Sequence, residues 1–244
     1  MVLKDLEVVV LCAGGGTRLG SITKKIPKPM IPICGKPFLE YILNFYKNKC
    51  ITQFVIPVGY LGNQIKDYFG DGSKFGVQIK YVESSVEVET GGSFKRAGPF
   101  INGDIFFMQW GDIFFPLDLE KMYNTFVNSD KEAMIVVSKR DKILDYQDKN
   151  DLLLDNDGNV ILYDLNNTSG KCTHLHCGLL LFKKTIFDLC VNDCFKLEID
   201  LFLPLIAKKS LLGFLVSSTP FDIGNSDKIK ETELRIKEFS NSCL

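Results

Sequence analysis

A glycine-rich segment that ends in an arginine is the first feature of this sequence that could do chemistry. It reads LCAGGGTRL over residues 11–19 and begins where an apolar stretch ends. Glycines let backbone N–H groups come close to phosphate oxygens, and the guanidinium of Arg18 can bind two such oxygens at once. The segment therefore predicts a phosphate-binding loop, although a plain glycine-rich turn would explain the glycines alone equally well.

Two common phosphate-binding motifs do not match this loop. No Gly-Lys-Ser/Thr follows it, which excludes the Walker A loop, and Leu19 stands where a dinucleotide fingerprint has its third glycine. The phosphate chemistry must therefore be of another kind.

Lys28 is the second candidate cation. It lies between Pro27 and Pro29, and prolines fix their own backbone and restrict the residue before them. A stiff segment of this kind holds a charge in place. We therefore prefer a functional role for Lys28 over that of an ordinary exposed loop lysine.

Alternating apolar strands and amphipathic helices must position these residues. The run from Glu7 to Cys12 is continuously apolar after its first residue, as in a strand buried on both faces of a parallel sheet. Residues 37–50 carry aromatic and aliphatic side chains at helical spacing. The same alternation predicts strands at 53–58, 77–83, 105–109 and 133–138, and helices at 64–69, 92–97 and 117–128. We expect an α/β fold with a Rossmann-like, doubly wound mixed sheet.

The second part of the chain has a different pattern. Apolar triplets at 152–154 and 160–162 flank Asp157-Gly158, which predicts a hairpin and hence a small antiparallel, substrate-binding insertion. A strand at 174–182, a helix at 199–207, a strand at 212–216 and a closing helix at 226–239 follow. We expect a single domain over residues 1–244, with a nucleotide-binding part at about 1–140, a sugar-phosphate lobe at about 141–225 and the closing helix at about 226–240.

Composition excludes several classes of protein. Lys and Arg total 29 against 30 Asp and Glu, a net charge of −1, so the bulk basic field of a nucleic-acid binder is missing. No apolar run approaches the roughly 20 residues of a membrane span. The start of the chain does not resemble a secretory leader, and eight scattered cysteines do not form a disulfide framework. We expect a cytoplasmic protein that binds neither membranes nor nucleic acids.

These motifs together resemble the sugar-1-phosphate nucleotidyltransferases, also called nucleotide-sugar pyrophosphorylases. That family opens with L-A-(A/G)-G-x-G-T-R-L, then P-K-P-M and G-K-P, and the matches here are residues 11–19, 27–30 and 35–37. Later blocks follow in family order at 70–73, 81–83, 90–92, 111–112, 197–200 and 221–224. The segment GKPFLEY at 35–41 is most similar to the D-glycero-α-D-manno-heptose 1-phosphate guanylyltransferases.

The resemblance implies attack of a sugar 1-phosphate on the α-phosphorus of GTP, with release of pyrophosphate. It makes Arg18 and Lys28 the catalytic cations, because several negative oxygens must come together. It makes Asp112 and Asp222 the ligands of a Mg²⁺ cofactor, and two carboxylates suit that hard ion. Asp112 follows an apolar run, at the carboxyl end of a predicted strand, where open α/β sheets bind ligands. The nucleophile is already anionic near neutral pH, so no general base is required.

The resemblance also implies nucleotide-binding and substrate-binding residues. Glu87 and Glu89 are candidates to accept the N1–H and N2–H donors of guanine. The other nucleotide-binding candidates are Leu11, Ala13, Gly14, Gly15, Gly16, Thr17, Arg18, Thr90, Gly91 and Gly92. The substrate-binding candidates are Lys28, Asp112, Gly178 and Glu198. The habit of the family further implies a homodimer.

Alternative functions stay open at this point. Mannose or glucose 1-phosphate could be the acceptor, and CTP, UTP or dTTP the donor. A catalytically silent nucleotide-sugar-binding module on the same fold is a second class, because fold does not fix function.

A zinc site is an alternative for the segment CTHLHC at 172–177. Strand alternation places Cys172, His174 and His176 on one face and Cys177 on the other. Four ligands then do not converge on one ion. We expect instead a strand that lines the sugar pocket.

Overall fold

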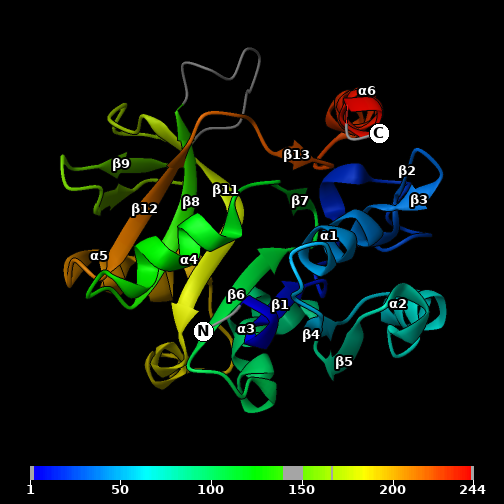
Figure 1. The fold of residues 1–244 in the computed structure, drawn as a ribbon, viewed down its shortest axis with the longest axis horizontal. Helices are drawn as coiled ribbons and strands as arrows, with labels where there is room; N and C mark the ends of the chain where they lie inside the picture. The colour runs from blue at the N-terminus through cyan, green and yellow to red at the C-terminus, as the bar shows by residue number, and fades with distance from the viewer. Residues whose placement is uncertain (1–2, 140–150, 166, 243–244) are drawn as a thin grey trace.

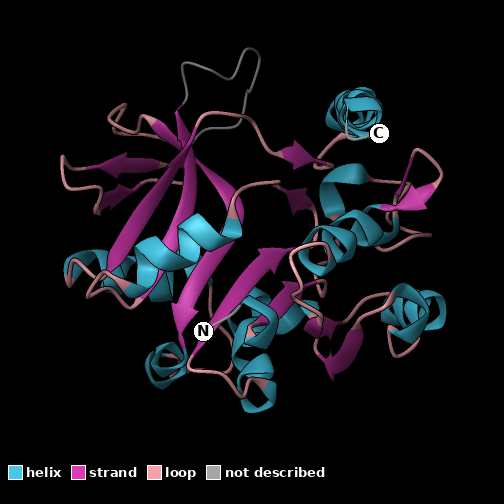
Figure 2. Ribbon diagram, viewed as in Figure 1, coloured by secondary structure: helices cyan, strands magenta, loops and turns pink. Residues whose placement is uncertain are grey.

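The computed structural model describes the backbone of residues 3–139, 151–165 and 167–242. Within these ranges a nine-stranded mixed sheet runs through the molecule, and helices cover both of its faces (Figure 1, Figure 2). The predicted α/β fold with a mixed, doubly wound sheet is thus confirmed.

Four neighbouring strands form the parallel half of the sheet. They are β1 (Glu7–Leu11), β4 (Gln53–Val58), β5 (Gln78–Glu83) and β6 (Ile105–Trp110), in the order β5-β4-β1-β6. The apolar run of β1 directs Val8 and Val10 toward one core cluster and Val9 toward the other. Burial on both faces explains why this strand is uniformly apolar instead of alternating with polar residues.

The other half of the sheet is centred on β11 (His174–Lys183). This strand pairs antiparallel with β6 on one side and with β8 (Ala133–Lys139) on the other, and β12 (Leu211–Val216) pairs parallel with β8. The second half of the chain therefore extends the sheet that the first half begins.

The predicted hairpin is attached to this half of the sheet. It consists of β9 (Leu152–Leu154) and β10 (Val160–Tyr163), and Leu152 pairs with His174 of β11. Its turn is closed by Asp155, whose Oδ1 accepts hydrogen bonds from the backbone N–H groups of Asp157 and Asn159. Two further two-stranded sheets are β2 with β3 (Pro32–Ile33, Lys36–Pro37) and β7 with β13 (Ile113–Phe114, Phe221–Asp222).

Helices separate into two layers, each with its own core cluster. The first layer contains α1 (Phe38–Lys47), α2 (Gly62–Phe69), α4 (Leu119–Val127) and α6 (Ser226–Ser242). The second contains α3 (Glu89–Ala97), α5 (Leu203–Ala207) and the π-helical turn η9 (Leu197–Phe202). Short 3-10 turns are η1 (Leu3–Asp5), η2 (Thr17–Leu19), η3 (Lys28–Met30), η4 (Ser73–Phe75), η5 (Val86–Val88), η6 (Gly98–Phe100) and η8 (Lys184–Leu189).

Several helices differ from the sequence prediction in their bounds, among them those at 197–207 and 89–97. The segment predicted as a helix over 199–207 begins at Leu197 as the turn η9, and α5 follows with Pro204 in its first turn. Proline has no N–H to donate, so the regular helix restarts around it. Helix α3 begins at Glu89, three residues before the predicted start at 92.

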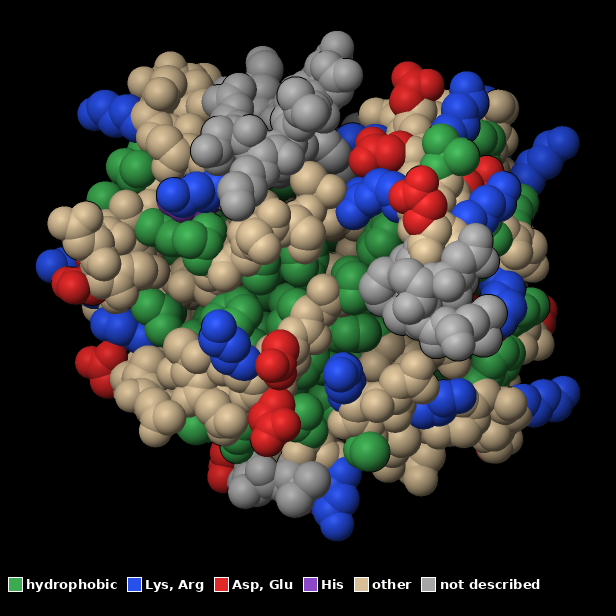
Figure 3. Space-filling model, turned by 45° about the horizontal axis from the view of Figure 1, so that its top comes forward, with side chains coloured by type: hydrophobic (Ala, Val, Ile, Leu, Met, Phe, Trp, Pro, Cys, Tyr) green, Lys and Arg blue, Asp and Glu red, His purple; other side chains and the backbone are tan. Residues whose placement is uncertain are grey.

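The surface carries charges of both signs. On the face shown in Figure 3, Lys, Arg, Asp and Glu side chains are interspersed around apolar ones, in keeping with the net charge of −1. Within the described part of the chain, no helix has both the length and the apolar character that crossing a bilayer requires.

Candidate active site

A cavity of about 470 Å³ lies beside the carboxyl ends of β1 and β6. Its walls come from the glycine loop after β1, the turn η3, the start of α3 and the turn η9. Most of the candidate residues from the sequence line it: Leu11, residues 13–17, Lys28, Glu89, Thr90, Asp112 and Glu198. The carboxyl end of a parallel sheet is the usual place for a ligand in an open α/β fold.

The glycine loop has a sharp turn at Gly16. This residue has φ of 62°, in the left-handed region, and a Cβ there would come within 2.8 Å of Thr23 Cγ2. Thr23 Oγ1 donates a hydrogen bond to the Gly16 carbonyl at 2.9 Å. Space around Gly14, in contrast, is open. The loop thus needs glycine for its own geometry at Gly16 and leaves room for a ligand at Gly14.

Arg18 follows this loop directly. Its backbone belongs to the turn η2, while its side chain lies outside the described part of the structure. The position of its backbone brings the arginine to the loop that lines the cavity; the role of its guanidinium stays a prediction.

Lys28 and Asp112 form an ion pair in the cavity wall. The turn η3 begins at Lys28, directly after the extended Pro27, and leaves the lysine only 7% exposed. Lys28 Nζ donates a hydrogen bond to Asp112 Oδ2, across 84 residues of sequence. The site therefore holds a buried ammonium and a carboxylate in contact at the edge of the cavity.

Asp222 lies on the strand next to the segment that carries Asp112. In the β7–β13 pair Asp222 is opposite Ile113, and the Ile223 N–H donates to the Asp112 carbonyl at 3.2 Å. The carboxylate of Asp222 accepts hydrogen bonds from Lys228 Nζ at 2.7 Å and from the Gly224 N–H at 2.6 Å. Asp222 is not among the residues that line the cavity.

The donor chemistry of these two aspartates suits a divalent cation. Both offer hard carboxylate oxygens, and each carboxylate has a lysine ammonium as a partner. Oxygen ligands of this type are those that Mg²⁺ prefers. Among the described residues no group of three or more such ligands converges, so a metal site made by Asp112 and Asp222 stays a prediction that their oxygen donors permit.

Contacts between α3 and η9 join the two parts of the chain beside the cavity. Thr90 Oγ1 donates to Glu198 Oε2 at 3.3 Å, and the Leu197 N–H donates to Thr90 Oγ1 at 3.2 Å. Glu89 forms an ion pair with Lys196 at 3.7 Å. Burial raises the pKa of the Glu198 carboxyl above its ordinary value. Glu198 and Lys28 line the same cavity. Carboxyl groups with a raised pKa are frequent at functional sites.

The neighbours of Gly91 and Gly92 differ from those of the glycine loop at residues 14–16. Neither lines the cavity. A Cβ on Gly91 would collide with the ring of Phe195, and one on Gly92 with the carbonyl oxygen of Asp193. The Gly91 N–H also donates to the Phe195 carbonyl at 2.9 Å. Packing against residues 193–195 thus accounts for both glycines, and nucleotide contact at these positions stays a prediction.

The two candidate base-binding glutamates, Glu87 and Glu89, differ in their position relative to the cavity. Glu89 lines the cavity, whereas Glu87 does not. A hydrogen bond with the Ser85 side chain lowers the pKa of the exposed Glu87 carboxyl, and the Glu87 carbonyl accepts from Cys194 Sγ at 3.0 Å. Glu89 is accordingly the better placed of the two to meet a base.

Gly178 lies in an irregularity of β11. Its φ is 75°, and the pairing register of β11 with β8 shifts between His176 and Leu180. The Gly178 carbonyl accepts from Gln109 Nε2 at 2.9 Å, and a Cβ would come within 2.7 Å of Ile113. The residue does not line the cavity, so substrate contact here stays a prediction.

Some cavity residues were not predicted from the sequence. Trp110, the one tryptophan of the chain, lines the cavity just before Asp112, as do Ser85, Val86 and Ser93. The position of Trp110 at the end of a predicted strand was a usable signal. Ser85 and Ser93 had none, because serines are typical of loops and helix starts.

Three comparisons relate this chain to known proteins. The model of the family described as Nucleotidyl transferase matches residues 7–146. A D-glycero-alpha-D-manno-heptose 1-phosphate guanylyltransferase of Campylobacter jejuni is 34% identical over 154 residues, which are 59% of this chain and 69% of that protein. One from Aneurinibacillus thermoaerophilus is 26% identical over 235 residues, 96% of this chain and 100% of that protein. The crystal structure of HddC from Yersinia pseudotuberculosis has a TM-score of 0.80 at 24% identity, covers 95% of this chain and 99% of that one, and supports the fold.

Proposed function

The chain belongs to the nucleotidyl transferase family and is a sugar-1-phosphate nucleotidyltransferase, and from that premise we propose that its donor is GTP and its acceptor D-glycero-α-D-manno-heptose 1-phosphate. The products are GDP-D-glycero-α-D-manno-heptose and pyrophosphate. The observation that carries the proposal is the cavity in which the glycine loop, Lys28 and Asp112 share one wall. The names of the two guanylyltransferases to which the chain is similar support the choice of substrates.

The reaction needs positioning and charge stabilisation more than proton transfer. A phosphate monoester has its second pKa at about 6, so the attacking oxygen is already anionic near neutral pH. That oxygen forms a bond to the α-phosphorus of GTP, and the bond from this phosphorus to the oxygen that bridges to the β-phosphorus breaks. Pyrophosphate leaves with that electron pair. No side chain has to remove a proton from the nucleophile.

The cations and N–H groups of the cavity supply the stabilisation. Backbone N–H groups of residues 13–17 and the guanidinium of Arg18 bind the triphosphate in this proposal. Lys28 exchanges its bond with Asp112 for phosphate oxygens as the substrates enter, so that its ammonium follows the negative charge to the reacting centre. Because Lys28 is already fixed in the wall, this placement needs little further ordering.

Asp112 and Asp222 are the residues that would hold Mg²⁺ in this enzyme. When bound, the ion offsets negative charge on the phosphate oxygens. Asp112 directly precedes β7, and Asp222 lies on β13, the strand that pairs with β7.

Recognition of the base and recognition of the sugar are assigned to two different residues of the cavity lining. Glu89 accepts hydrogen bonds from N1–H and N2–H of guanine in this proposal, in preference to Glu87, which lies outside the lining. Glu198, which lines the cavity from η9, is the proposed sugar contact.

Pyrophosphate release tests the proposal. The assay combines ATP, GTP, CTP, UTP or dTTP with a small set of sugar 1-phosphates, including the heptose and mannose compounds, in the presence of Mg²⁺. We expect release with GTP and the heptose phosphate. Release with a different pair would keep the mechanism and overturn the substrates, and nucleotide binding without any release would favour a silent binding module.

A further inference from the structure

Gln109 is a polar side chain in the interior of the sheet. It lies on β6, whose neighbours are β1 and β11, and it is only 1% exposed. Phe107, two residues earlier on the same face of the strand, belongs to the first core cluster. A strand that is covered on both faces normally contains apolar residues, and a buried amide destabilises the fold unless it forms hydrogen bonds. The glutamine therefore calls for an explanation at this position.

The amide group of Gln109 binds three backbone carbonyl groups. Its Nε2 donates to the carbonyl oxygens of Ile113 at 2.6 Å, Gly178 at 2.9 Å and Trp110 at 3.3 Å. Carbonyl oxygens only accept hydrogen bonds, so these partners require the nitrogen of the amide on their side. The Tyr46 hydroxyl, from α1, donates to Oε1 at 3.4 Å. Both polar atoms of the amide are thus engaged.

These contacts close the turn that presents Asp112. Two of the three carbonyl groups belong to the first and last residues of the segment 110–113, so the amide joins the two ends of the turn. Within the turn, the Gly111 N–H donates to the Leu11 carbonyl of β1 at 3.0 Å. The turn is therefore held at its ends by one side chain and in its middle by β1.

The same contacts extend to Asp222. Ile113 is the first residue of β7, and Asp222 lies opposite it on β13, the strand beside β7 in Figure 1. The Ile223 N–H also donates to the Asp112 carbonyl at 3.2 Å. One buried amide therefore connects β6, β11 and the β7–β13 pair, from which both aspartates are presented.

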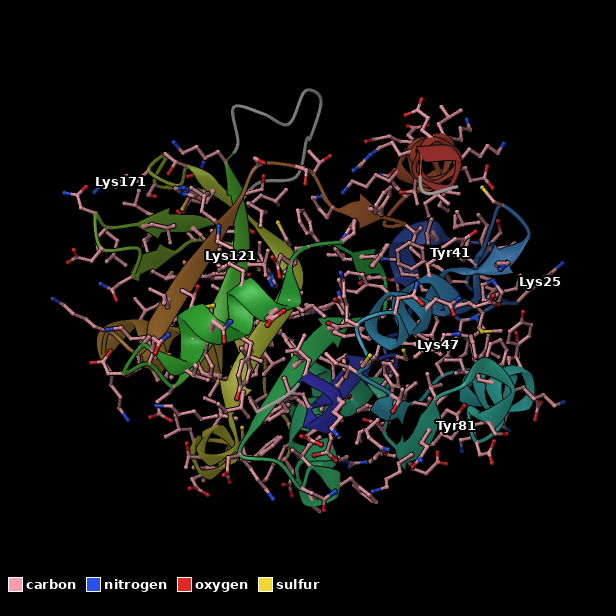
Figure 4. The ribbon with its side chains drawn as sticks, in the orientation of Figure 1. Lys25, Tyr41, Lys47, Tyr81, Lys121 and Lys171 are labelled. Carbon is pink, nitrogen blue, oxygen red and sulfur yellow. The ribbon has the colours of Figure 1, made fainter. Side chains whose placement is uncertain are left out.

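Two other polar side chains of the sheet differ from Gln109. The hydroxyl groups of Tyr81 and Ser138 have no hydrogen-bond partner among the described residues. Tyr81 lies on the edge strand β5, which β1 and β4 separate from β6 (Figure 4). Ser138 lies near the end of β8. The amide of Gln109, in contrast, is fully used, and its partners belong to the turn that carries Asp112.

We propose that Gln109 is a positioning residue for nucleotidyl transfer. Its amide holds the turn at 110–113 and so fixes the Asp112 carboxylate at the cavity, in register with the strand of Asp222. The inference deepens the proposed function and rests on it. Catalysis by positioning depends on such support, because a displacement of about 1 Å at a reacting group can reduce the rate about 100-fold.

Two variants of Gln109 and two controls test this inference. Gln109→Met keeps a side chain of similar length and volume and removes both N–H donors. Gln109→Asn keeps the donors on a chain that is one carbon shorter. Tyr46→Phe removes the contact at Oε1 and leaves the three carbonyl contacts in place. Phe69→Leu weakens the packing of α2, elsewhere in the first core cluster, and so controls for lost stability.

Each protein is measured in three ways. Steady-state pyrophosphate release gives kcat and the KM values for the nucleotide and the sugar phosphate, thermal unfolding gives Tm, and tryptophan emission reports on the turn. The emission is specific because Trp110 is the one tryptophan of the chain, and its carbonyl is a partner of the Gln109 amide. The emission measurement does not require an active enzyme.

We expect Gln109→Met to lower kcat roughly 10- to 100-fold while both KM values change less than about threefold, because a displaced Asp112 affects the transfer step more than binding. The emission of Trp110 should shift to longer wavelength as water enters the loosened turn. Gln109→Asn should recover part of kcat. Tyr46→Phe and Phe69→Leu should keep the wild-type kcat and emission, although Phe69→Leu should lower Tm.

The outcomes separate this inference from the proposed function. If Gln109→Met has a kcat within twofold of the wild type, or an unchanged Trp110 emission, the inference is overturned and the proposed function stands. If Phe69→Leu loses as much kcat at a similar Tm, kcat follows stability, and Gln109 is structural only. If Gln109→Met does not fold, Gln109→Asn decides by the same measurements. If the wild-type chain releases no pyrophosphate with any pair, the proposed function fails and takes the inference with it.

Discussion

Replacement of Lys28 by methionine should destabilise the protein as well as inactivate it. Methionine keeps most of the volume of the lysine chain and removes the ammonium that Asp112 contacts. The Asp112 carboxylate then stays in the cavity wall with less compensation for its charge. Breaking a buried pair from one side is costly because it leaves a desolvated charge behind.

The expected magnitude follows from the exposure of the two side chains. A fully buried pair costs about 3–5 kcal/mol when one partner is removed. Here the lysine side chain is 9% exposed and the aspartate 22%, so water screens part of the charge and we expect about 2–3 kcal/mol. For a chain of this size each kcal/mol lowers Tm by about 2–4 °C, which gives a decrease of roughly 4–12 °C.

A double-mutant cycle isolates the contribution of the pair. Urea unfolding of the wild type, Lys28→Met, Asp112→Asn and the double variant gives four free energies of unfolding. Because the double variant leaves no charge of the pair behind, it should recover most of the loss, with a coupling energy of about 1.5–3 kcal/mol. Pyrophosphate release should be abolished in all three variants.

A coupling energy below about 0.5 kcal/mol would refute the reasoning, since that is the range of an exposed ion pair or of independent sites. A Lys28→Met protein with wild-type turnover would separately refute the role of Lys28 as a substrate ligand.

The remaining predictions concern Arg18, Gly91 and Glu198. Arg18→Ala should abolish pyrophosphate release while the circular dichroism spectrum and Tm stay as in the wild type; near wild-type turnover would remove Arg18 from the mechanism. Gly91→Ala should lower the free energy of unfolding by about 1–3 kcal/mol, because the new methyl group meets the ring of Phe195, and Gly14→Ala, which has open space, is the stability control. Glu198→Gln should raise Tm at pH 7. Folding raises the pKa of the Glu198 carboxyl, so the folded protein is less stable when this group is ionised than when it is neutral. The gain should disappear below the ordinary pKa of 4.5, where the glutamate is protonated in both states, and an equal gain at all pH values would contradict this cause.

Local patterns were sufficient to predict most of the secondary structure. The strand predicted over 53–58 has the bounds of β4. A short apolar run between polar turns is typical of a strand in a sheet that is covered on both faces. Asp112 was predicted at the end of a strand for the same local reason, and the structure places it at the cavity.

Contacts between distant segments could not be predicted in this way. The ion pair of Lys28 and Asp112 joins residues 84 apart, and no spacing rule relates them. Gly91 is a nucleotide-binding candidate by resemblance, and its crowding comes from Phe195, more than a hundred residues later. The ring of His176 packs against Trp110 and Phe202, which come from two other elements.

The central place of β11 has a consequence for synthesis of the chain. Strands β6 and β8 both border β11, so each presents an unpaired edge on the ribosome until residues 174–183 have emerged. Unpaired edges invite pairing with other chains. The cavity residues from β1 to Asp112 are thus translated early. The sheet that positions them is complete only after β11 has been synthesised. We expect a chain that stops at residue 139 to aggregate, and the nascent enzyme to depend on chaperones during that interval.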